Sequence, residues 1–297
     1  MSWQAVARKD FQDSIRSRTV LALSAVFVAL FTVPAYFLAQ EVGGLFAAET
    51  GQQLTSDAFI SVLSSVIAFF VPIIAIALAY ASVAGERDSG TMKLLLSLPH
   101  SRRDVLVGKI LGRSAVIVLP VLIGFAAAIV VFLLTPVSLS LGNYVAFALL
   151  SALLGVVFVC LAVGISAAAK TRRQAMFGNV GIYVLFTLFW GSFAEGVVNL
   201  LNEYTDIGFE TLVDVQLATL LLNPTESFQS LAAILWTNDP LGARLAVFGG
   251  GIAGQVYGQA LDPLSWYFSN PMVAIAFLAW LVVPPVLGYL VFREADL

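Results

Sequence analysis

Six long stretches of this sequence carry almost no charge, and they limit what the chain can fold into. They cover residues 20–39, 58–84, 114–134, 144–169, 175–198 and 272–292, and Glu195 is the one charged residue within them. A helix of about 20 residues crosses the roughly 30 Å hydrocarbon core of a bilayer. Because 60% of the chain is hydrophobic, one water-soluble core could not hold it all. We predict an all-α polytopic membrane protein, a single domain over residues 1–297 with six transmembrane helices.

Positive charge lies on alternate connections between these spans. Of the 15 Lys and Arg residues, all except Arg244 fall in residues 1–19, 85–113, 170–174 and 293–297. The other connections, 40–57, 135–143 and 199–271, hold only Arg244. Short loops rich in Lys and Arg stay on the cytoplasmic side of a membrane. The pattern predicts a multi-pass protein of a prokaryotic plasma membrane, with both termini in the cytoplasm.

Residues 1–19 have the pattern of an amphipathic helix. Trp3, Ala7, Phe11 and Ile15 recur every four residues, with the basic residues mostly on the other side. Such a helix lies in the headgroup region of a bilayer. We therefore predict an interfacial helix, which serves either as a simple positive anchor or as part of a docking surface.

The segment between the second and third spans, residues 85–100, is short and sharply bounded. Asp88 or Ser89 can cap a helix, residues 91–98 supply about two turns rich in leucine, and Pro99 ends it. A helix this short is unstable alone, and exposed leucines mark an interaction surface. The segment either docks on a partner or folds back on its own membrane domain.

A second helix start follows at once. Ser101 and Asp104 have the S-x-x-D spacing of a capping box, which predicts a helix that runs on into the third span. On that helix Arg102, Lys109 and Arg113 share one face at 100° per residue. We expect a basic stripe at the membrane edge.

Residues 85–113 read GERDSGTMKLLLSLPHSRRDVLVGKILGR. In its order of Gly-Glu, Ser-Gly-Thr, leucine cluster, Pro, Arg and Gly-Lys, this segment resembles the signature of ABC-2-type permeases, the membrane subunits of ATP-binding-cassette exporters. The likeness continues in the interfacial helix, the six spans, the tight SAAAKTRRQA link after the fourth span and the external segment before the sixth. Within this family the chain is most similar to permeases of nitrous oxide reductase maturation transporters, on ARKDFQDSIRSR, VPIIAIALAYASVAGERDSGTMKLLLSLPHSR and LNPTESFQSL.

The resemblance implies a partner and a site. In such transporters the segment between spans two and three is a coupling helix seated in a cleft on a separate cytoplasmic ATPase, and two permeases pair with two ATPases. A second copy of this chain is the expected permease partner, and no nucleic acid is expected. The matching coupling positions here are Glu86, Arg87, Gly90, Thr91, Leu94, Leu95, Leu96, Pro99 and Arg102.

The chain has no nucleotide-binding motif of its own. Its only Gly-Lys pair, Gly108 and Lys109, is followed by Ile110 where a phosphate-binding loop needs Ser or Thr. We therefore expect a transport subunit without catalytic residues, in a complex whose ATPase subunit binds ATP and magnesium. One Cys, one His and four scattered Met residues form no pattern for a metal site, so no cofactor is expected in this chain.

Two spans have faces that suit a pathway or a dimer interface. Small residues line one side of the second span, and polar or aromatic residues line one side of the fifth. Small faces also let helices pack closely in lipid, which is the simpler explanation. The resemblance favours the pathway or interface, because in the family these two spans meet their mates at the dimer axis. The candidates are Ser61, Ser64, Ser65, Pro72, Asn179, Tyr183, Phe186, Trp190 and Glu195, although Glu195 lies close enough to the outer end to reach water.

Residues 199–271 are too few for a sizeable domain and too many for a turn. Residues 209–222 have helical character, and after the Asn223-Pro224 break apolar residues recur at helical spacing. We predict short external helices that dip into the outer leaflet.

Three interpretations of function follow. The first is the permease of an ATP-driven exporter that works by alternating access. The second, implied by the closer likeness, is a permease that supplies a sulfur or other cofactor precursor for maturation of a copper enzyme. The third is an ATP-independent carrier or an intramembrane enzyme, which usually needs an ionisable group at mid-depth, and no span provides one. A purely structural anchor would leave the segment 85–100 unexplained.

Overall fold

The computed structural model describes residues 3–15, 18–50, 53–92, 101–249 and 251–294. Across these residues the chain is helical and no sheet forms, with one isolated bridge between Thr55 and Ser138. Six helices are long and apolar enough to cross a membrane. They are Val20–Phe46, Ser56–Asp88, Arg102–Leu133, Leu141–Ala168, Arg172–Tyr204 and Asn270–Glu294. The predicted fold class, all-α with six long apolar helices, is confirmed.

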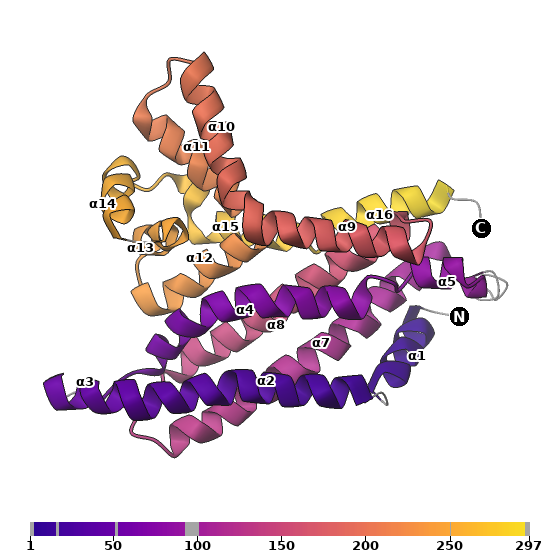
Figure 1. The fold of residues 1–297 in the computed structure, drawn as a ribbon, viewed down its shortest axis with the longest axis horizontal. Coiled ribbons are helices and arrows are strands. Elements are labelled where there is room, and N and C mark those ends of the chain that lie inside the picture. Colours follow the sequence, from indigo (N-terminus) through magenta and orange to yellow (C-terminus); the bar gives the residue numbers. More distant parts are fainter. Residues whose placement is uncertain (1–2, 16–17, 51–52, 93–100, 250, 295–297) are drawn as a thin grey trace.

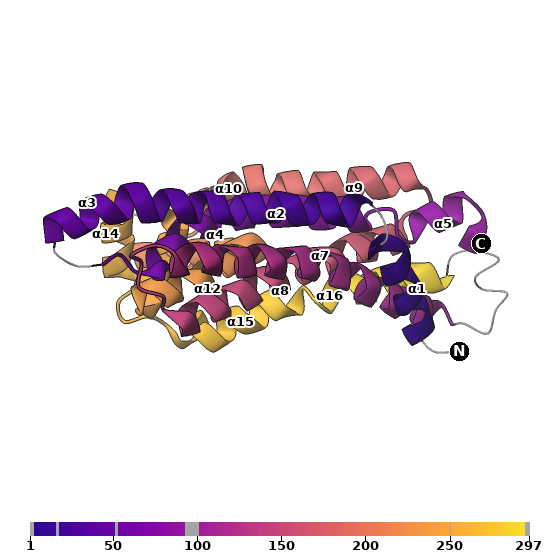
Figure 2. The ribbon, with the colours of Figure 1, turned by 90° about the horizontal axis from the view of Figure 1, so that it is seen from below.

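The long helices run side by side, and both chain ends lie at the same end of the bundle (Figure 1). We call this the terminal end; α1 and α5 lie there, and α3, α13 and α14 lie at the opposite, cap end (Figures 1 and 2). The helices are α1 Trp3–Ile15, α2 Arg18–Phe37, α3 Gly43–Thr50, α4 Ser56–Ala79, α5 Ala84–Asp88, α7 Arg102–Leu133, α8 Leu141–Ala168, α9 Arg172–Val184, α10 Trp190–Tyr204, α11 Phe209–Leu221, α12 Pro224–Thr237, α13 Pro240–Leu245, α14 Gly251–Ala260, α15 Asn270–Ala279 and α16 Val283–Glu294.

The helix of the third span begins well before residue 114. Ser101 is its N-cap: the Ser101 hydroxyl accepts from the backbone N–H of Asp104 at 3.1 Å, and the Asp104 carboxylate accepts from the backbone N–H of Ser101 at 3.2 Å. The predicted capping box is confirmed. It starts α7 about three turns before the uncharged stretch, so the basic residues of 102–113 lie on a continuous helix.

The fifth and sixth spans are each interrupted near the middle, which the uncharged stretches did not predict. A π-helical turn over Leu185–Phe189 joins α9 to α10, and α10 turns away from the bundle (Figure 1). A turn at residues 280–282 separates α15 from α16, directly before Pro284 and Pro285. Proline has no backbone N–H to donate and its ring clashes with the preceding turn. These two spans are therefore broken helices.

α8 lies at the centre of the bundle and packs against α4, α7 and α16. Its contact with α16 depends on two glycines. A Cβ on Gly164 would overlap the carbonyl of Pro284, and a Cβ on Gly288 would overlap the backbone of Gly164. Lipid gives helices no hydrophobic reason to associate, so close packing of small residues has to hold them together. The backbones of α8 and α16 touch here because neither glycine has a side chain.

Residues 205–269 form a cap of short helices. The predicted helices correspond to α11 and α12, and Asn223 separates them: its side chain accepts from the N–H of Thr225, and Pro224 is the first residue of α12. α13 and α14 were not predicted. A small second core forms between this segment and α15, from Val213, Leu217, Leu221, Leu261, Phe268 and Val273, while Phe228 and Ala232 of α12 belong to the main core.

Arg244, the exception in the charge pattern, is fully buried in this cap. Its guanidinium donates to the Phe268 carbonyl at 2.8 Å, the Ser230 hydroxyl at 2.7 Å and the Asn270 side-chain oxygen at 2.6 Å. Burial lowers the pKa of Arg244 to about 10. Arg244 therefore holds α13 against α12 and the start of α15. This structural role explains why the cap contains a cation, so Arg244 need not take part in setting the orientation of the chain in the membrane.

Replacing Gly164 by valine should separate α8 from α16. Because a side chain there would meet backbone, the helices must move apart, and we expect a loss of about 1–3 kcal/mol, seen as a lower unfolding midpoint in detergent. The control is Gly142→Val in the first turn of α8, where nothing lies within 4 Å of a built Cβ. Equal midpoints for the two variants would contradict the assigned packing.

Candidate functional site

The candidate site is the terminal end of the bundle, where the chain leaves α4 and returns in α7. Residues 80–83 form a turn, α5 follows, and Gly90 ends it with a φ of +75°, a conformation that favours glycine. Thr91 and Met92 are again helical. Residues 93–100 lie outside the described residues, and with them four predicted coupling positions: Leu94, Leu95, Leu96 and Pro99.

The outgoing arm of this segment is fastened to α8. The hydroxyl of Ser166 accepts hydrogen bonds from the backbone N–H groups of Val83 at 3.2 Å and Ala84 at 3.1 Å. Arg87 donates to the carbonyl of Ala169 at 3.0 Å, just beyond the last residue of α8. These bonds satisfy backbone N–H groups that the start of α5 leaves free and a carbonyl at the end of α8, and they fix where α5 begins.

The turn at Gly90 has its own internal bonds. The Thr91 hydroxyl donates to the carbonyl of Glu86 at 3.3 Å and lies 2.9 Å from the hydroxyl of Ser89. Met92 is fully buried. The sequence-predicted positions Glu86, Gly90 and Thr91 therefore meet in one tight turn.

Four charged side chains from three helices meet beside this turn. Lys109 of α7 lies 2.7 Å from a carboxylate oxygen of Glu86 and 3.8 Å from one of Asp10. Arg113, one turn further along α7, donates to Asp10 at 3.1 Å and also to the carbonyl of Leu78 at 3.0 Å. We call Asp10, Glu86, Lys109 and Arg113 the charge cluster; it joins α1, α5 and α7.

The charge cluster gives two residues of the predicted basic stripe carboxylate partners. Lys109 and Arg113 share one face of α7, and this face points toward α1 and α5; the Lys109 side chain is only 5% exposed. Two carboxylates balance the two cations. Buried charges are tolerated when they are paired, and removing one partner of such a pair is costly. The sequence alone did not predict this pairing.

Two arginines anchor other parts of this end. Arg102 donates to the carbonyls of Phe292 at 2.5 Å and Arg293 at 2.8 Å, so the returning arm is tied to the end of α16. Arg172, in the link after α8, donates to the Tyr80 hydroxyl at 2.8 Å, where α4 ends. The ends of α4, α7, α9 and α16 are thus cross-connected by charged side chains.

α1 is seated on α7 through two glycines. A Cβ on Gly108 would lie 2.6 Å from the Cβ of Val6, and one on Gly112 would lie 2.8 Å from the carboxylate of Asp10. The buried face of α1 thus runs through Val6 and Asp10, whereas Trp3 of the predicted apolar face is 40% exposed. Gly108 and Lys109 lie within a helix, where Gly108 allows close packing of α1. They are not part of a loop, as the Gly-Lys pair of a phosphate-binding motif would be.

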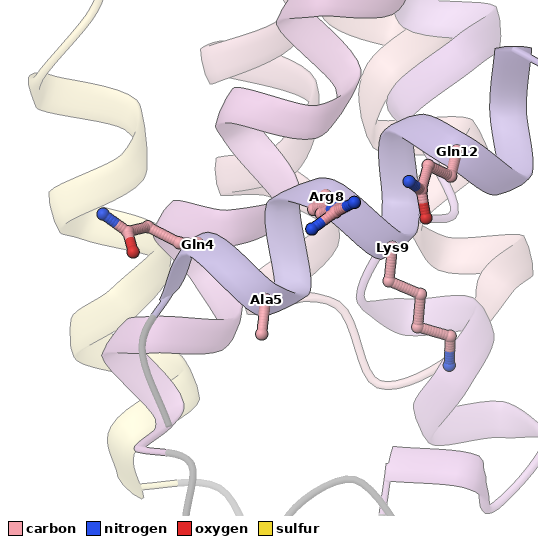
Figure 3. A pocket seen from close by; sticks show the side chains of 5 residues that line it. All are labelled: Gln4, Ala5, Arg8, Lys9 and Gln12. Carbon is pink, nitrogen blue, oxygen red and sulfur yellow. The ribbon is translucent and has the colours of Figure 1, made fainter.

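The outward face of α1 is polar. Figure 3 shows Gln4, Ala5, Arg8, Lys9 and Gln12 around a shallow hollow of about 390 Å³. This face points away from α7 and carries two cations. It is the exposed basic surface of the described part of α1.

The candidate residues of the second span separate into two groups. Ser61, Ser64 and Ser65 of α4 face α12 and line a hollow of about 270 Å³ with residues of the cap, among them Gln229. Pro72 is buried within the bundle. The small face of α4 is therefore partly packed and partly open.

The candidate residues of the fifth span mostly turn inward. Asn179 donates to the carbonyl of Ala175, Tyr183 donates to the carbonyl of Phe69 at 3.1 Å, and Trp190 donates to the carbonyl of Thr219 at 3.0 Å. Phe186 makes edge-to-face contacts with the rings of Trp190 and Trp280. Glu195, in contrast, is exposed. The opposite face is apolar and open, with more than half of each of these side chains exposed: Phe177, Leu188 and Phe189.

Three residues of these sites were missed from the sequence. Asp10 looked like one more charge on an anchor helix, and Ser166 looked like part of an uncharged span. Glu226 was assigned to the exterior, yet its side chain lines a second hollow beside α4, and burial raises its pKa to about 7. Of these three residues, only Glu226 could have been singled out from the sequence. It is an acidic residue that follows Asn223-Pro224, in the first turn of a helix with an apolar face.

Replacing Asp10 by asparagine should loosen the terminal end. Lys109 would then keep Glu86 as its partner, and Arg113 would be left with the carbonyl of Leu78. Breaking a buried pair this way costs about 3–5 kcal/mol, so the unfolding midpoint falls clearly. Asp88→Asn is the matched control, because Asp88 is exposed on α5. If Asp10→Asn unfolds at the same temperature as the control, the charge cluster does not hold α1 to α7.

Comparison with known proteins agrees with this geometry. A family model described as ABC-2 family transporter protein matches residues 4–297. The probable ABC transporter permease protein NosY of Stutzerimonas stutzeri is 32% identical over 299 residues, which cover 97% of each chain. The protein of the same name from Pseudomonas aeruginosa is 36% identical over 229 residues, 75% of this chain and 78% of the relative.

The match to the family model covers nearly the whole chain, and the first relative aligns from end to end. Together with six long apolar helices, this identifies a multi-pass membrane protein. The chain belongs to the ABC-2 transporter family, as a NosY-like permease subunit of an ABC transporter.

Proposed function

We propose that the chain is the permease half of an exporter that works by alternating access. A permease subunit of this family implies a partner ATPase subunit, which we place on the terminal end of the bundle. Two ATPases and two permeases would form the complex, with ATP and magnesium bound by the ATPases. ATP binding would draw the two ATPases together and move the permease helices from inward-open to outward-open.

One observation carries this proposal: both arms of the segment 85–102 are bonded to several helices at once. The outgoing arm is tied to α8 through Ser166 and to α7 through Glu86 and Lys109. The returning arm is tied to α16 through Arg102. A partner that moves this segment would therefore move four or more helices together, as coupling requires.

The proposed coupling residues have two kinds of role. Glu86, Arg87, Gly90, Thr91 and Arg102 would hold the segment in place through the bonds described above. Leu94, Leu95, Leu96 and Pro99 would form the surface that the ATPase contacts. This division follows from chemistry, since leucines contribute apolar contact area and the charged residues already have partners within the chain.

The distribution of basic residues supports an ATPase at the terminal end of the bundle. The described basic residues other than Arg244 lie on α1, α5, the α8–α9 link, the end of α16 and the starts of α2, α7 and α9, which gather at the terminal end (Figure 1). Loops rich in Lys and Arg remain in the cytoplasm, where ATP is available. We therefore place both termini in the cytoplasm and the cap outside.

The open apolar face of α9 and α10 supports a second permease copy. In the most apolar stretch of Arg172–Tyr204, only 11% of the residues are buried within the chain. We propose that this face and the small face of α4 border the dimer axis and the pathway, with Ser61, Ser64 and Ser65 on the pathway side. Asn179, Tyr183, Phe186 and Trp190 would hold the fifth helix in position, with Pro72 packed behind them and Glu195 at the outer mouth.

Replacing both Leu94 and Leu95 by aspartate should disconnect the ATPase. Two carboxylates in an apolar contact cannot be desolvated without a large cost, so the ATPase should no longer co-purify with the permease and the permease should no longer stimulate its activity. The matched control is Leu134→Asp with Leu141→Asp, two exposed leucines at the cap end. Unchanged co-purification and unchanged stimulation in the Leu94/Leu95 variant would reject the coupling role.

A second candidate function is supported by the two NosY relatives. In the family resemblance, permeases of this kind supply a sulfur or other cofactor precursor for maturation of nitrous oxide reductase. We propose this as the more specific role of the same transport activity. The described residues contain no group of three His, Cys, Asp or Glu side chains arranged to hold a metal, so the cargo we propose is a precursor other than bare copper.

A complementation experiment tests the maturation role. This chain, expressed with its own ATPase in a bacterium that lacks its NosY permease, should restore nitrous oxide reduction. The Leu94/Leu95 variant should not restore it. Failure of the wild-type chain, in cells where the permease and its ATPase co-purify, would reject the maturation role and leave the transporter assignment in place.

A further inference from the structure

A polar hollow leads from the cap end of the bundle toward the middle of α4. Its outer part, of about 270 Å³, is lined by Ser61, Ser64, Ser65, Gln229, Ala233, Trp236, Ala246 and Gly249. Its inner part, of about 140 Å³, is lined by Ser65, Ala68, Phe69, Phe186, Thr187, Thr225, Glu226 and Gln229. The two parts meet at Ser65 and Gln229, where the Ser65 hydroxyl donates to the Gln229 side-chain oxygen at 3.4 Å. Glu226 lines the inner part, on the far side of this hydrogen bond from the outer part.

The inner part of the hollow is deep. Ser65 and Phe69 lie nine and thirteen residues from Ser56, the first residue of α4, and at 1.5 Å per residue this places them roughly 14–20 Å along the helix. That is about half of a hydrocarbon core. No transmembrane stretch of the sequence carries a charge at this depth, but the hairpin of α11 and α12 brings one there.

The carboxylate of Glu226 has no partner in the described part of the chain: no ion pair or hydrogen bond to it is formed. The position of Glu226 in the first turn of α12 offers it only the weak field of the helix dipole. A buried carboxylate normally has a cation or several hydrogen-bond donors beside it. Glu226 instead faces an open hollow with hydroxyl and amide groups around it.

The charged groups on neighbouring helices are engaged elsewhere. Asp57 of α4 accepts from Asn143, Arg244 of α13 binds Ser230, and Asp214 of α11 accepts from Tyr267. Glu210 of α11 is exposed. The two cations of α9 lie in its first turn, away from the hollow: Arg172 donates to Tyr80 and Arg173 lies over the ring of Phe177. The other titratable groups on α8 and α9 are uncharged side chains: Tyr144, Cys160 and Tyr183. No described cation is therefore available to neutralise Glu226.

The geometry points to a binding site for a small ammonium-type organic cation in this hollow, with Glu226 as its counter-charge. The carboxylate supplies the negative charge, and the Ser65, Thr187, Thr225 and Gln229 side chains supply oxygen atoms around it. The rings of Phe69 and Phe186 line the same space, and aromatic faces attract quaternary ammonium groups. Oxygen and aromatic groups without thiol, thioether or imidazole do not suit a soft metal such as Cu(I).

This site does not depend on the direction of transport or on the coupling segment. It does constrain the cargo, because an anion reaching the inner hollow would meet an unneutralised carboxylate. A cationic solute, or a neutral one with a cationic group, fits the charge of the hollow.

Binding of radiolabelled tetramethylammonium to the full chain in lipid nanodiscs tests the proposal. Since burial raises the pKa of Glu226 to about 7, the carboxyl is mostly protonated at pH 6 and mostly ionised at pH 8, so wild-type affinity should rise about tenfold between these values. Glu226→Gln should bind at least tenfold more weakly at pH 8 and show no such rise. Glu210→Gln, an exposed carboxylate on α11, should behave as wild type.

Thermal unfolding of the same variants separates binding from folding. Ionisation of a buried carboxyl destabilises the folded state, so at pH 8 the Glu226→Gln variant should unfold at the same or a higher temperature than wild type. Three results would overturn the proposal: no wild-type binding of tetramethylammonium, equal binding by Glu226→Gln, or displacement of the label by sodium at equal ionic strength as effectively as by unlabelled tetramethylammonium. None of these measurements involves the ATPase, so the coupling proposal stands or falls separately.

Discussion

The charge cluster of Asp10, Glu86, Lys109 and Arg113 is the interaction on which the terminal end of this permease depends. The side chains of Lys109 and Asp10 are 5% and 9% exposed, and those of Arg113 and Glu86 are partly exposed. Charges shielded from water in this way are stable only if each has a partner, because the low dielectric that strengthens their attraction also makes an unpaired charge expensive. The partners come from α1, α5 and α7, so none of these elements can move without the others. The segment that would meet the ATPase is therefore mounted on a rigid base.

Glycine makes this base possible. Gly108 and Gly112 let α1 approach α7 closely enough for Asp10 to reach Arg113, and Gly164 and Gly288 bring α16 onto α8. Helices in lipid associate through close packing and a few polar bonds. The same chain uses polar bonds at helix termini: Ser166 accepts from N–H groups at the start of α5, and Arg102 donates to carbonyls at the end of α16. Packing therefore holds the middle of the bundle, and polar bonds hold its terminal end.

The cap also contributes side chains to a hollow beside α4. α12 packs against the cap-end half of α4 and brings Glu226 beside Ser65 and Phe69. A carboxylate thus lies beside a spanning helix without being part of one. Arg244, buried in the cap with three hydrogen bonds, stabilises the arrangement that places α12 there.

Local chemistry let the sequence by itself determine a good deal: the six long apolar helices, the Ser101–Asp104 capping box, the break at Asn223-Pro224 and the family to which the chain belongs. Hydropathy, capping and proline act over a few residues, so a single stretch carries their signal. The sequence could not show that the cationic face of α7 turns inward or that an acidic residue of the cap lines a hollow beside α4. Only the tertiary structure decided these features, because each depends on contact between residues far apart in the chain: Lys109 with Glu86 and Asp10, and Glu226 with α4. A contact between residues far apart in the chain produces no periodic pattern in the sequence around either residue.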